Sequence, residues 1–225
     1  MLKGDDLRWE RWGAIGGFLY VIGMILLFVL RGEPPQDATT EQLLQFYQDN
    51  EFAVTWGTYI VATVGGLGFL WFLGSLRSAL RRAEGDTGRV SIIAMAAGTG
   101  SLILLFGAVG AFVSAAFFAV DPGNVNFRFD LSIHEMVVGS GFGLFIFHVV
   151  LASALVAATS VVSIRTAVFP KWLGWVGALL ALALVLPFVS FFALFAFFTW
   201  VVVIAILLLT GRGIRPTYGA TPPAG

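Results

Sequence analysis

Cysteine is absent from the 225-residue chain, and only 12% of its residues are charged. Without cysteine the chain has no disulfide-stapled secreted domain, no thiol nucleophile and no lipid-anchored cysteine. Soluble domains carry about 25% charged residues, and half that supply could not cover the surface of a soluble globule of 24.2 kDa. These absences exclude an ordinary cytosolic enzyme and a disordered chain.

Long uncharged apolar runs take the place of the missing charges. A bilayer core of about 30 Å needs roughly 20 helical residues at about 1.5 Å each, so each of the first four runs suffices for one crossing. The last run is too long for one helix and contains Pro187, which removes a backbone N–H and breaks helices. The runs are Gly13–Leu30, Ala53–Leu76, Val90–Val120, Met136–Ile164 and Trp172–Thr210.

These runs predict an all-α fold, a polytopic transmembrane bundle of six helices that forms a single domain over residues 1–212. Residues 213–225, which include three prolines, are predicted to form a flexible cytoplasmic tail. The fifth helix is short for a crossing, and a tight turn at Pro187–Ser190 separates it from the sixth. The predicted helices cover residues 12–31, 52–76, 90–120, 133–164, 172–187 and 190–211.

The placement of basic residues predicts the orientation. With the N-terminus inside, 11 of the 13 Lys and Arg residues fall on cytoplasmic segments, and only Arg31 and Arg128 fall outside. Eight of the 13 acidic residues fall outside. Because Lys and Arg are retained on the cytoplasmic side, both termini are predicted to be cytoplasmic. We therefore expect a multi-pass membrane protein.

The first outer loop, Arg31–Phe52, carries a local signal for a helix. Thr39 and Gln42 have the spacing of a capping box, in which each side chain pairs with the backbone of the other. Leu43, Leu44 and Tyr47 then supply a partly apolar face. We expect a short amphipathic helix that lies on the outer membrane surface or packs over the mouth of the bundle.

His148 is the only ionisable side chain deep inside a predicted span, which makes it the candidate intramembrane polar site. A helical wheel places Thr159 and Ser163 on the same face, and this stripe would favour an inward, partly polar surface. One interpretation is a proton relay or a ligand contact at His148. The other is a neutral histidine that is hydrogen-bonded to a neighbouring hydroxyl or carbonyl.

Asp130 and His134 form the candidate outer-face site. They are four residues apart, a spacing that puts both on one helical face and suits metal coordination. The second histidine of a zinc-protease motif is missing, because Met136 and two valines follow Glu135. The alternative is a capping box from Ser132 to Glu135 that begins the fourth helix, so no metal is predicted.

Cofactor and nucleic-acid binding are not expected. His134 and His148 would lie about 21 Å apart on one helix, too far for them to hold one haem iron together. Lys3 and Lys171 lie at predicted inner boundaries, so no lysine is available for a midplane Schiff base. The basic residues are spread along the inner loops as topology signals, and this distribution does not indicate nucleic-acid binding. With no nucleophile–base pair at a suitable spacing, no enzyme is predicted.

Three stretches of the chain carry a resemblance. RWGAIGGFLY from Arg11, LGSLRSALRRAEG from Leu73 and FPKWLGWVG from Phe169 resemble segments of uncharacterised bacterial integral membrane proteins of the actinobacterial type. These are six-helix proteins grouped under domains of unknown function. The resemblance covers most of residues 8–210. It implies a multi-pass helical protein of the bacterial plasma (inner) membrane, without an assigned reaction or substrate.

Two functions remain open from the sequence. The first is a non-catalytic membrane component that binds a partner protein or a lipid through its bundle and outer loop. Such partners include the bilayer itself, another membrane protein or a second copy of the chain. The alternative is a permease for a small solute, a proton or a lipid, with a path past His148.

The predicted topology can be tested by cysteine labelling. A cysteine placed within Pro34–Asn50 should react with an impermeant thiol reagent on intact cells, whereas one placed at either terminus should react only after permeabilisation. The natural chain is the control, since it has no cysteine of its own. Labelling of Pro34–Asn50 from the same side as the two ends would contradict the topology.

Overall fold

The computed structural model describes residues 4–32, 34, 38–85, 88–120 and 131–211, with side chains described from Arg11 onward. Over this part of the chain the regular elements are all helical, which confirms the all-α prediction. Five segments are long and apolar enough to cross a membrane. They are Arg11–Arg31, Ala53–Glu84, Arg89–Ala119, Leu131–Thr166 and Ser190–Thr210.

The helices follow one another with short connections. α6 has only 15 residues and is the shortest of the apolar helices. A five-residue π-helical segment, η1 (Ala53–Gly57), runs directly into α3. The α-helices are α1 (Gly4–Arg31), α2 (Thr40–Asp49), α3 (Thr58–Glu84), α4 (Arg89–Val120), α5 (Leu131–Thr166), α6 (Lys171–Val185) and α7 (Ser190–Thr210).

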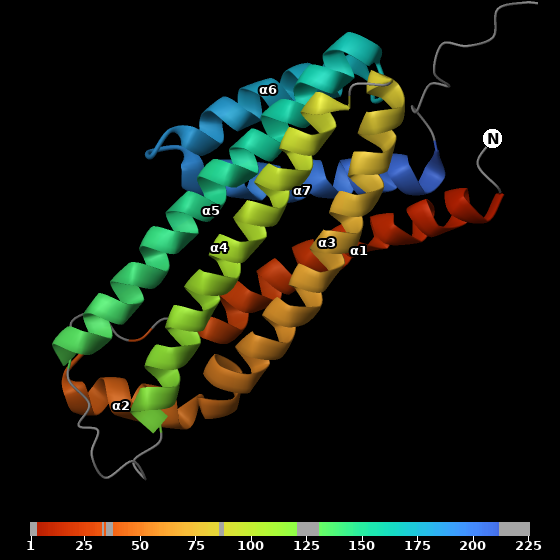
Figure 1. Ribbon diagram of the computed structural model, residues 1–225. Helices are drawn as coiled ribbons and strands as arrows, with labels where there is room; N and C mark the ends of the chain where they lie inside the picture. Colours follow the sequence, from red (N-terminus) through yellow and green to blue (C-terminus); the bar gives the residue numbers. More distant parts are fainter. Residues whose placement is uncertain (1–3, 33, 35–37, 86–87, 121–130, 212–225) are drawn as a thin grey trace, which may run out of the picture.

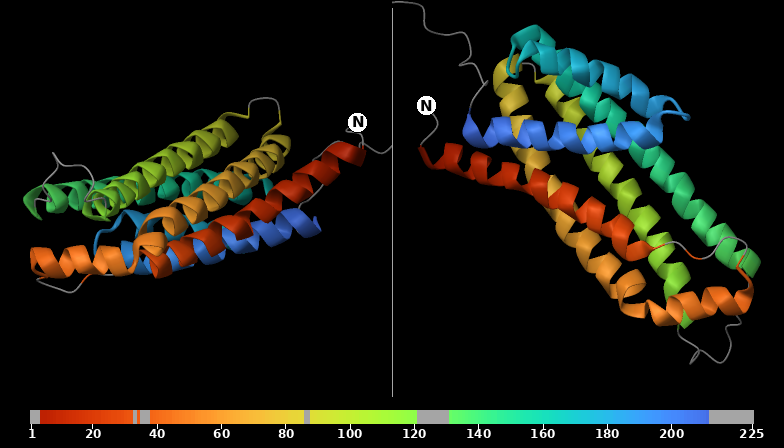
Figure 2. Two further views of the ribbon diagram at one scale, coloured as in Figure 1. Left: turned by 90° about the horizontal axis from the view of Figure 1, so that it is seen from below. Right: turned by 180° about the vertical axis from the view of Figure 1, so that it is seen from behind.

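The six apolar helices form a closed ring of neighbours. α1 packs on α3, α3 on α4, α4 on α5, α5 on α6, and α6 on α7, which returns to α1. α3, α4 and α5 lie side by side, and α2 lies across one end of them (Figure 1). We call this the α2 end. α6 and α7 lie beside the other half of the bundle, and α1 starts there next to the end of α7 (Figure 2).

Close backbone approach joins α1 to α3. Gly16 faces the carbonyl of Gly68, and a methyl group added at Gly23 would lie 3.1 Å from the Cα atom of Gly65. Small residues permit such contacts. In lipid, where hydrophobic expulsion does not drive helices together, this close packing stabilises their association. Between these two glycine contacts Tyr20 stacks on Phe69 with ring centroids 4.2 Å apart.

The lengths of the helices differ in a way that shapes the α2 end. The apolar part of α1 and the whole of α7 have 21 residues each, or about 31 Å, which matches one bilayer core. α4 and α5 have 32 and 36 residues, or about 48 and 54 Å. Their surplus length supports a second apolar cluster, in which Leu43 and Tyr47 of α2 pack with Ala116 and Ala119 of α4.

Local sequence signals account for where several helices begin and end. The capping box at α2 is confirmed, because Thr39 N–H donates to Gln42 Oε1 (2.9 Å) and Gln42 N–H to Thr39 Oγ1 (3.3 Å). The turn at Pro187 is also present, and Leu186 O accepts from the N–H groups of Val189 and Ser190.

Two boundaries differ from the sequence-based expectation by more than two residues. α1 begins at Gly4 rather than at residue 12. α3 continues to Glu84 instead of ending near residue 76. It ends there because Gly85 follows with a φ of 77°, a backbone conformation that does not continue a helix. The predicted tail, 213–225, lies outside the described residues.

The α1–α3 seam predicts different effects for two glycine substitutions. Gly16→Ala should lower the free energy of unfolding by about 1–3 kcal/mol, because the new methyl group meets backbone atoms of Gly68 that cannot move aside. Gly74→Ala is the matched control on α3, since nothing lies within 4 Å of its added Cβ. It should be neutral or stabilising by up to about 1 kcal/mol. Thermal unfolding of the purified protein in detergent measures both, and equal melting temperatures would contradict the seam.

Candidate functional site

His148 belongs to α5, where its side chain faces Ser101 of α4 and is only 1% exposed. Its Nδ1 atom is 2.8 Å from Ser101 Oγ and 2.9 Å from the carbonyl oxygen of Ser101. Ser101 Oγ in turn donates to the carbonyl oxygen of His148 at 3.0 Å. Because that hydroxyl proton is already used, the neutral ring is assigned its proton on Nδ1, which donates to Ser101. This geometry fits the second interpretation of His148, a histidine bonded to a neighbouring hydroxyl and carbonyl.

The other two residues of the predicted intramembrane site do not join His148. Thr159 and Ser163 are buried on α5, as expected for its inward face. Their hydroxyls donate to carbonyls one turn back in the same helix, at 2.9 and 2.7 Å. They lie about 16 and 22 Å from His148 along the helix axis. The shared face is therefore a packing surface rather than one polar site.

The predicted outer-face site is only partly described. Asp130 lies outside the described residues, whereas His134 sits in the first turns of α5. α5 already begins at Leu131, so Ser132 lies inside the helix rather than at its cap. His134 faces α2, with ring centroids 5.5 Å from Tyr47 and Nε2 3.5 Å from the Tyr47 hydroxyl. Among the described residues no group of three or more His, Asp or Glu side chains could hold a metal ion.

An apolar pocket opens near His134, between α1, α3, α4 and α5. Its cavity volume is about 40 Å³, and it is partly open to the outside. Its walls are almost entirely hydrocarbon, and the Phe28 and Phe145 rings contact each other across it from α1 and α5. The lining residues are Leu27, Phe28, Arg31, Thr58, Leu105, Ala108, Val109, Phe112, Phe142 and Phe145.

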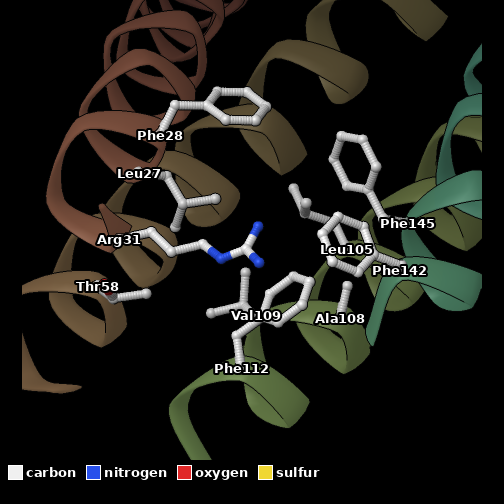
Figure 3. A pocket seen from close by; sticks show the side chains of 10 residues that line it. All are labelled: Leu27, Phe28, Arg31, Thr58, Leu105, Ala108, Val109, Phe112, Phe142 and Phe145. Atoms are coloured by element: carbon white, nitrogen blue, oxygen red, sulfur yellow. The ribbon is translucent and has the colours of Figure 1, made fainter. Parts of the chain in front are cut away.

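Arg31 is the one charged side chain among these lining residues. Its guanidinium points into the middle of the ring of apolar side chains (Figure 3). The Cζ atom lies 3.9 Å from the centroid of Phe112 and 4.9 Å from that of Phe142. These cation–π contacts connect the end of α1 to both α4 and α5. The positive charge also suits the last turn of α1, where the helix dipole is negative.

A second, more polar pocket adjoins the first. The two share Arg31, Thr58 and Phe112, and the second also includes Tyr47 and His134. Burial raises the pKa of Tyr47, and the positive charge of Arg31 opposes that shift. The phenol therefore keeps its proton at neutral pH. Three side chains with polar groups, Arg31, Tyr47 and His134, thus converge here from α1, α2 and α5.

Comparisons with known proteins do not assign the chain to a family or suggest a function for it. No protein-family model, curated protein or solved structure matches the chain.

Sequence reasoning missed two of the residues that matter at these sites. Ser101 gave no signal, because a serine within a long apolar run is unremarkable. Arg31 did give one: it is among the only two basic residues placed outside by the predicted topology. A cation that departs from the positive-inside trend is a candidate for a specific role.

The His148–Ser101 contact predicts a measurable stability effect. Ser101→Ala should lower the free energy of unfolding by about 1 kcal/mol, because it removes a buried hydrogen bond between α4 and α5. Ser153→Ala is the matched control, since that hydroxyl donates to Val150 O within α5 and joins no second helix. SDS-induced unfolding in mixed micelles compares them. A Ser153→Ala loss as large as that of Ser101→Ala would contradict the assigned role.

Proposed function

We propose that this protein is a non-catalytic, six-pass component of the bacterial plasma membrane that binds a membrane lipid at the α2 end of its bundle. The observation that carries the proposal is the apolar pocket with the Arg31 guanidinium at its centre (Figure 3). A hydrocarbon slot with one cation matches the two parts of an amphiphile. Ligand pockets of this kind are mostly apolar with a few placed polar groups.

The arrangement of the helices supports the proposed topology, with both termini in the cytoplasm. A methyl group added at Gly211 would lie 3.5 Å from an Arg11 guanidinium nitrogen, so the start of the first span and the end of the last lie together. Lys171 and the exposed indoles of Trp172 and Trp175 begin α6 at the end opposite α2. Such residues favour a membrane interface. In this topology α6 makes the fifth crossing and α7 the sixth, and the α2 end faces outward.

The pocket walls favour a lipid chain over a soluble ligand. Leu27, Leu105 and Val109 present hydrocarbon from α1 and α4, and phenylalanines present it from α1, α4 and α5. The end of a lipid chain in this pocket gains close packing on several sides, which fluid lipid does not provide. Because the bilayer is itself apolar, a lipid chain gains little hydrophobic free energy when it moves from the bilayer into this pocket. The walls therefore favour a chain through its shape.

The permease alternative has less support in this geometry. Neither of the two pockets described here is lined by His148. Phe145 lines the apolar pocket and contacts His148 with ring centroids 5.5 Å apart, so its ring stands between the two. A flux path through His148 would require this phenylalanine to move.

Filling the pocket tests the proposed function. Val109→Phe should reduce the lipid that co-purifies with the protein about tenfold or more, because the larger ring occupies the slot. Native mass spectrometry from a mild non-ionic detergent measures the retained lipid.

Ile103→Phe is the matched control, since it adds a ring to the same helix at a side chain that is 64% exposed, outside the pocket lining. It should leave the retained lipid unchanged. The melting temperature shows whether Val109→Phe is folded. If the folded variant retains as much lipid as the natural chain, the proposal is wrong.

A further inference from the structure

We propose that three exposed aromatic side chains at the α2 end, Trp56, Tyr59 and Phe117, bind the headgroup region of the lipid bilayer. We call these three residues the aromatic patch. By seating the bundle at this level, the patch holds α2 in water, outside the hydrocarbon layer. The inference rests on the membrane placement in the proposed function and adds a surface separate from the pockets.

The aromatic patch joins two neighbouring segments of the bundle. Trp56 belongs to η1 and Tyr59 to the first turn of α3, and both side chains are more than half exposed. Trp56 meets Phe117 of α4 edge to face, with ring centroids 5.7 Å apart, and meets Tyr59 similarly at 6.3 Å. These contacts hold the rings together as one surface.

The polar groups of the patch suit a lipid headgroup. Within the described part of the chain, neither the indole N–H of Trp56 nor the hydroxyl of Tyr59 has a hydrogen-bond partner. Each ring therefore combines an apolar body with a polar tip that can bond to lipid ester or phosphate oxygens. Trp and Tyr are enriched at membrane interfaces for this reason.

The order of the exposed side chains around α3 favours a bilayer over a protein partner. The exposed polar residues 49–51 precede the patch. Exposed aliphatic side chains follow it on one face of α3, and Trp71 and then Arg81 are exposed beyond them. Polar, aromatic, aliphatic, aromatic and charged is the order met on crossing a bilayer. The aliphatic side chains are Ile60, Val64 and Leu67.

The outer face of α2 is suited to water rather than to the membrane interface. A helix that lies in the interface turns its apolar face toward the lipid. In α2 that face is already used, because its four apolar side chains, Leu43, Leu44, Phe46 and Tyr47, pack in the cluster with α4. The exposed side chains of α2 are all polar: Glu41, Gln42, Gln45, Gln48 and Asp49.

The patch also sets the depth of the two pockets. Thr58 directly precedes Tyr59, but its side chain is buried and lines both pockets. The pockets therefore lie at the level of the lipid headgroups. A lipid of the same leaflet can reach them without leaving the bilayer.

Quenching by brominated lipids measures the depth of Trp56. The purified full-length protein is placed in phosphatidylcholine–phosphatidylglycerol liposomes whose lipids carry bromine either close to the headgroup or close to the chain end. The fluorescence of Trp56 is the difference between the natural chain and Trp56→Phe. Bromine close to the headgroup should quench it about twofold or more beyond bromine at the chain end, because the indole lies at the interface.

Trp200→Phe is the matched control for this difference measurement. Trp200 is buried and stacks on Phe197 inside the bundle. Its share of the fluorescence should be quenched much less than that of Trp56 by headgroup-proximal bromine. Melting temperatures in detergent show that both variants are folded.

Spin labels give a second reading that leaves the patch intact. Because the chain has no cysteine, a single cysteine can be introduced on α2 as Gln45→Cys or on α3 as Val64→Cys, both at exposed positions. In the same liposomes, a nitroxide on Gln45→Cys should respond mainly to a water-soluble nickel complex. One on Val64→Cys should respond mainly to oxygen, which concentrates in hydrocarbon.

The outcomes separate this inference from the proposed function. If chain-end bromine quenches Trp56 more strongly, or if the nitroxide on Gln45→Cys responds mainly to oxygen, the inference is wrong. It is also wrong if neither lipid quenches Trp56, since a protein surface such as a second copy then covers the patch. Lipid binding in the pocket is judged by Val109→Phe, and it stands or fails there whatever the depth of Trp56.

Discussion

The backbone contact between α1 and α3 is the constraint on which the rest of the structure depends. Helices in lipid gain little from burying apolar side chains, because the surroundings are equally apolar. Glycines at 16 and 23 of α1 meet glycines at 68 and 65 of α3, and this seam fixes the height and rotation of α1. A fixed height matters because α1 ends at Arg31, within reach of two aromatic rings on other helices.

The site at the α2 end is assembled from segments that are each held for local reasons. Arg31 is positioned by the register of α1, the phenylalanines by the extension of α4 and α5, and Tyr47 by the capped helix α2. The long helices carry the site beyond the level at which α1 ends. A polar pocket can therefore lie directly above an apolar one, which is the order of environments across the surface of a bilayer.

Local chemistry explains what the sequence reveals of this protein. Some features depend only on residues that are close in the sequence, so the sequence alone predicts them. They are the long apolar runs, the capping box at Thr39 and the break at Pro187. The sites depend on contacts between distant segments. His148 is conspicuous in the sequence, but its partner Ser101 lies 47 residues away and looks ordinary. Arg31 is visible as an outlier of charge, while the rings around it become evident only when α1, α4 and α5 are assembled.

The brevity of α6 has a consequence for the surrounding membrane. Its 15 residues span about 22 Å, roughly 8 Å less than an average hydrocarbon core. The turn that follows suits immersion, because Leu186 O takes two N–H groups, Pro187 has none, and Phe188 is 96% exposed. In the proposed six-pass topology the bilayer beside α6 would have to be thinner than average to match this short helix. That topology would place the protein in thin or easily deformed regions of its membrane.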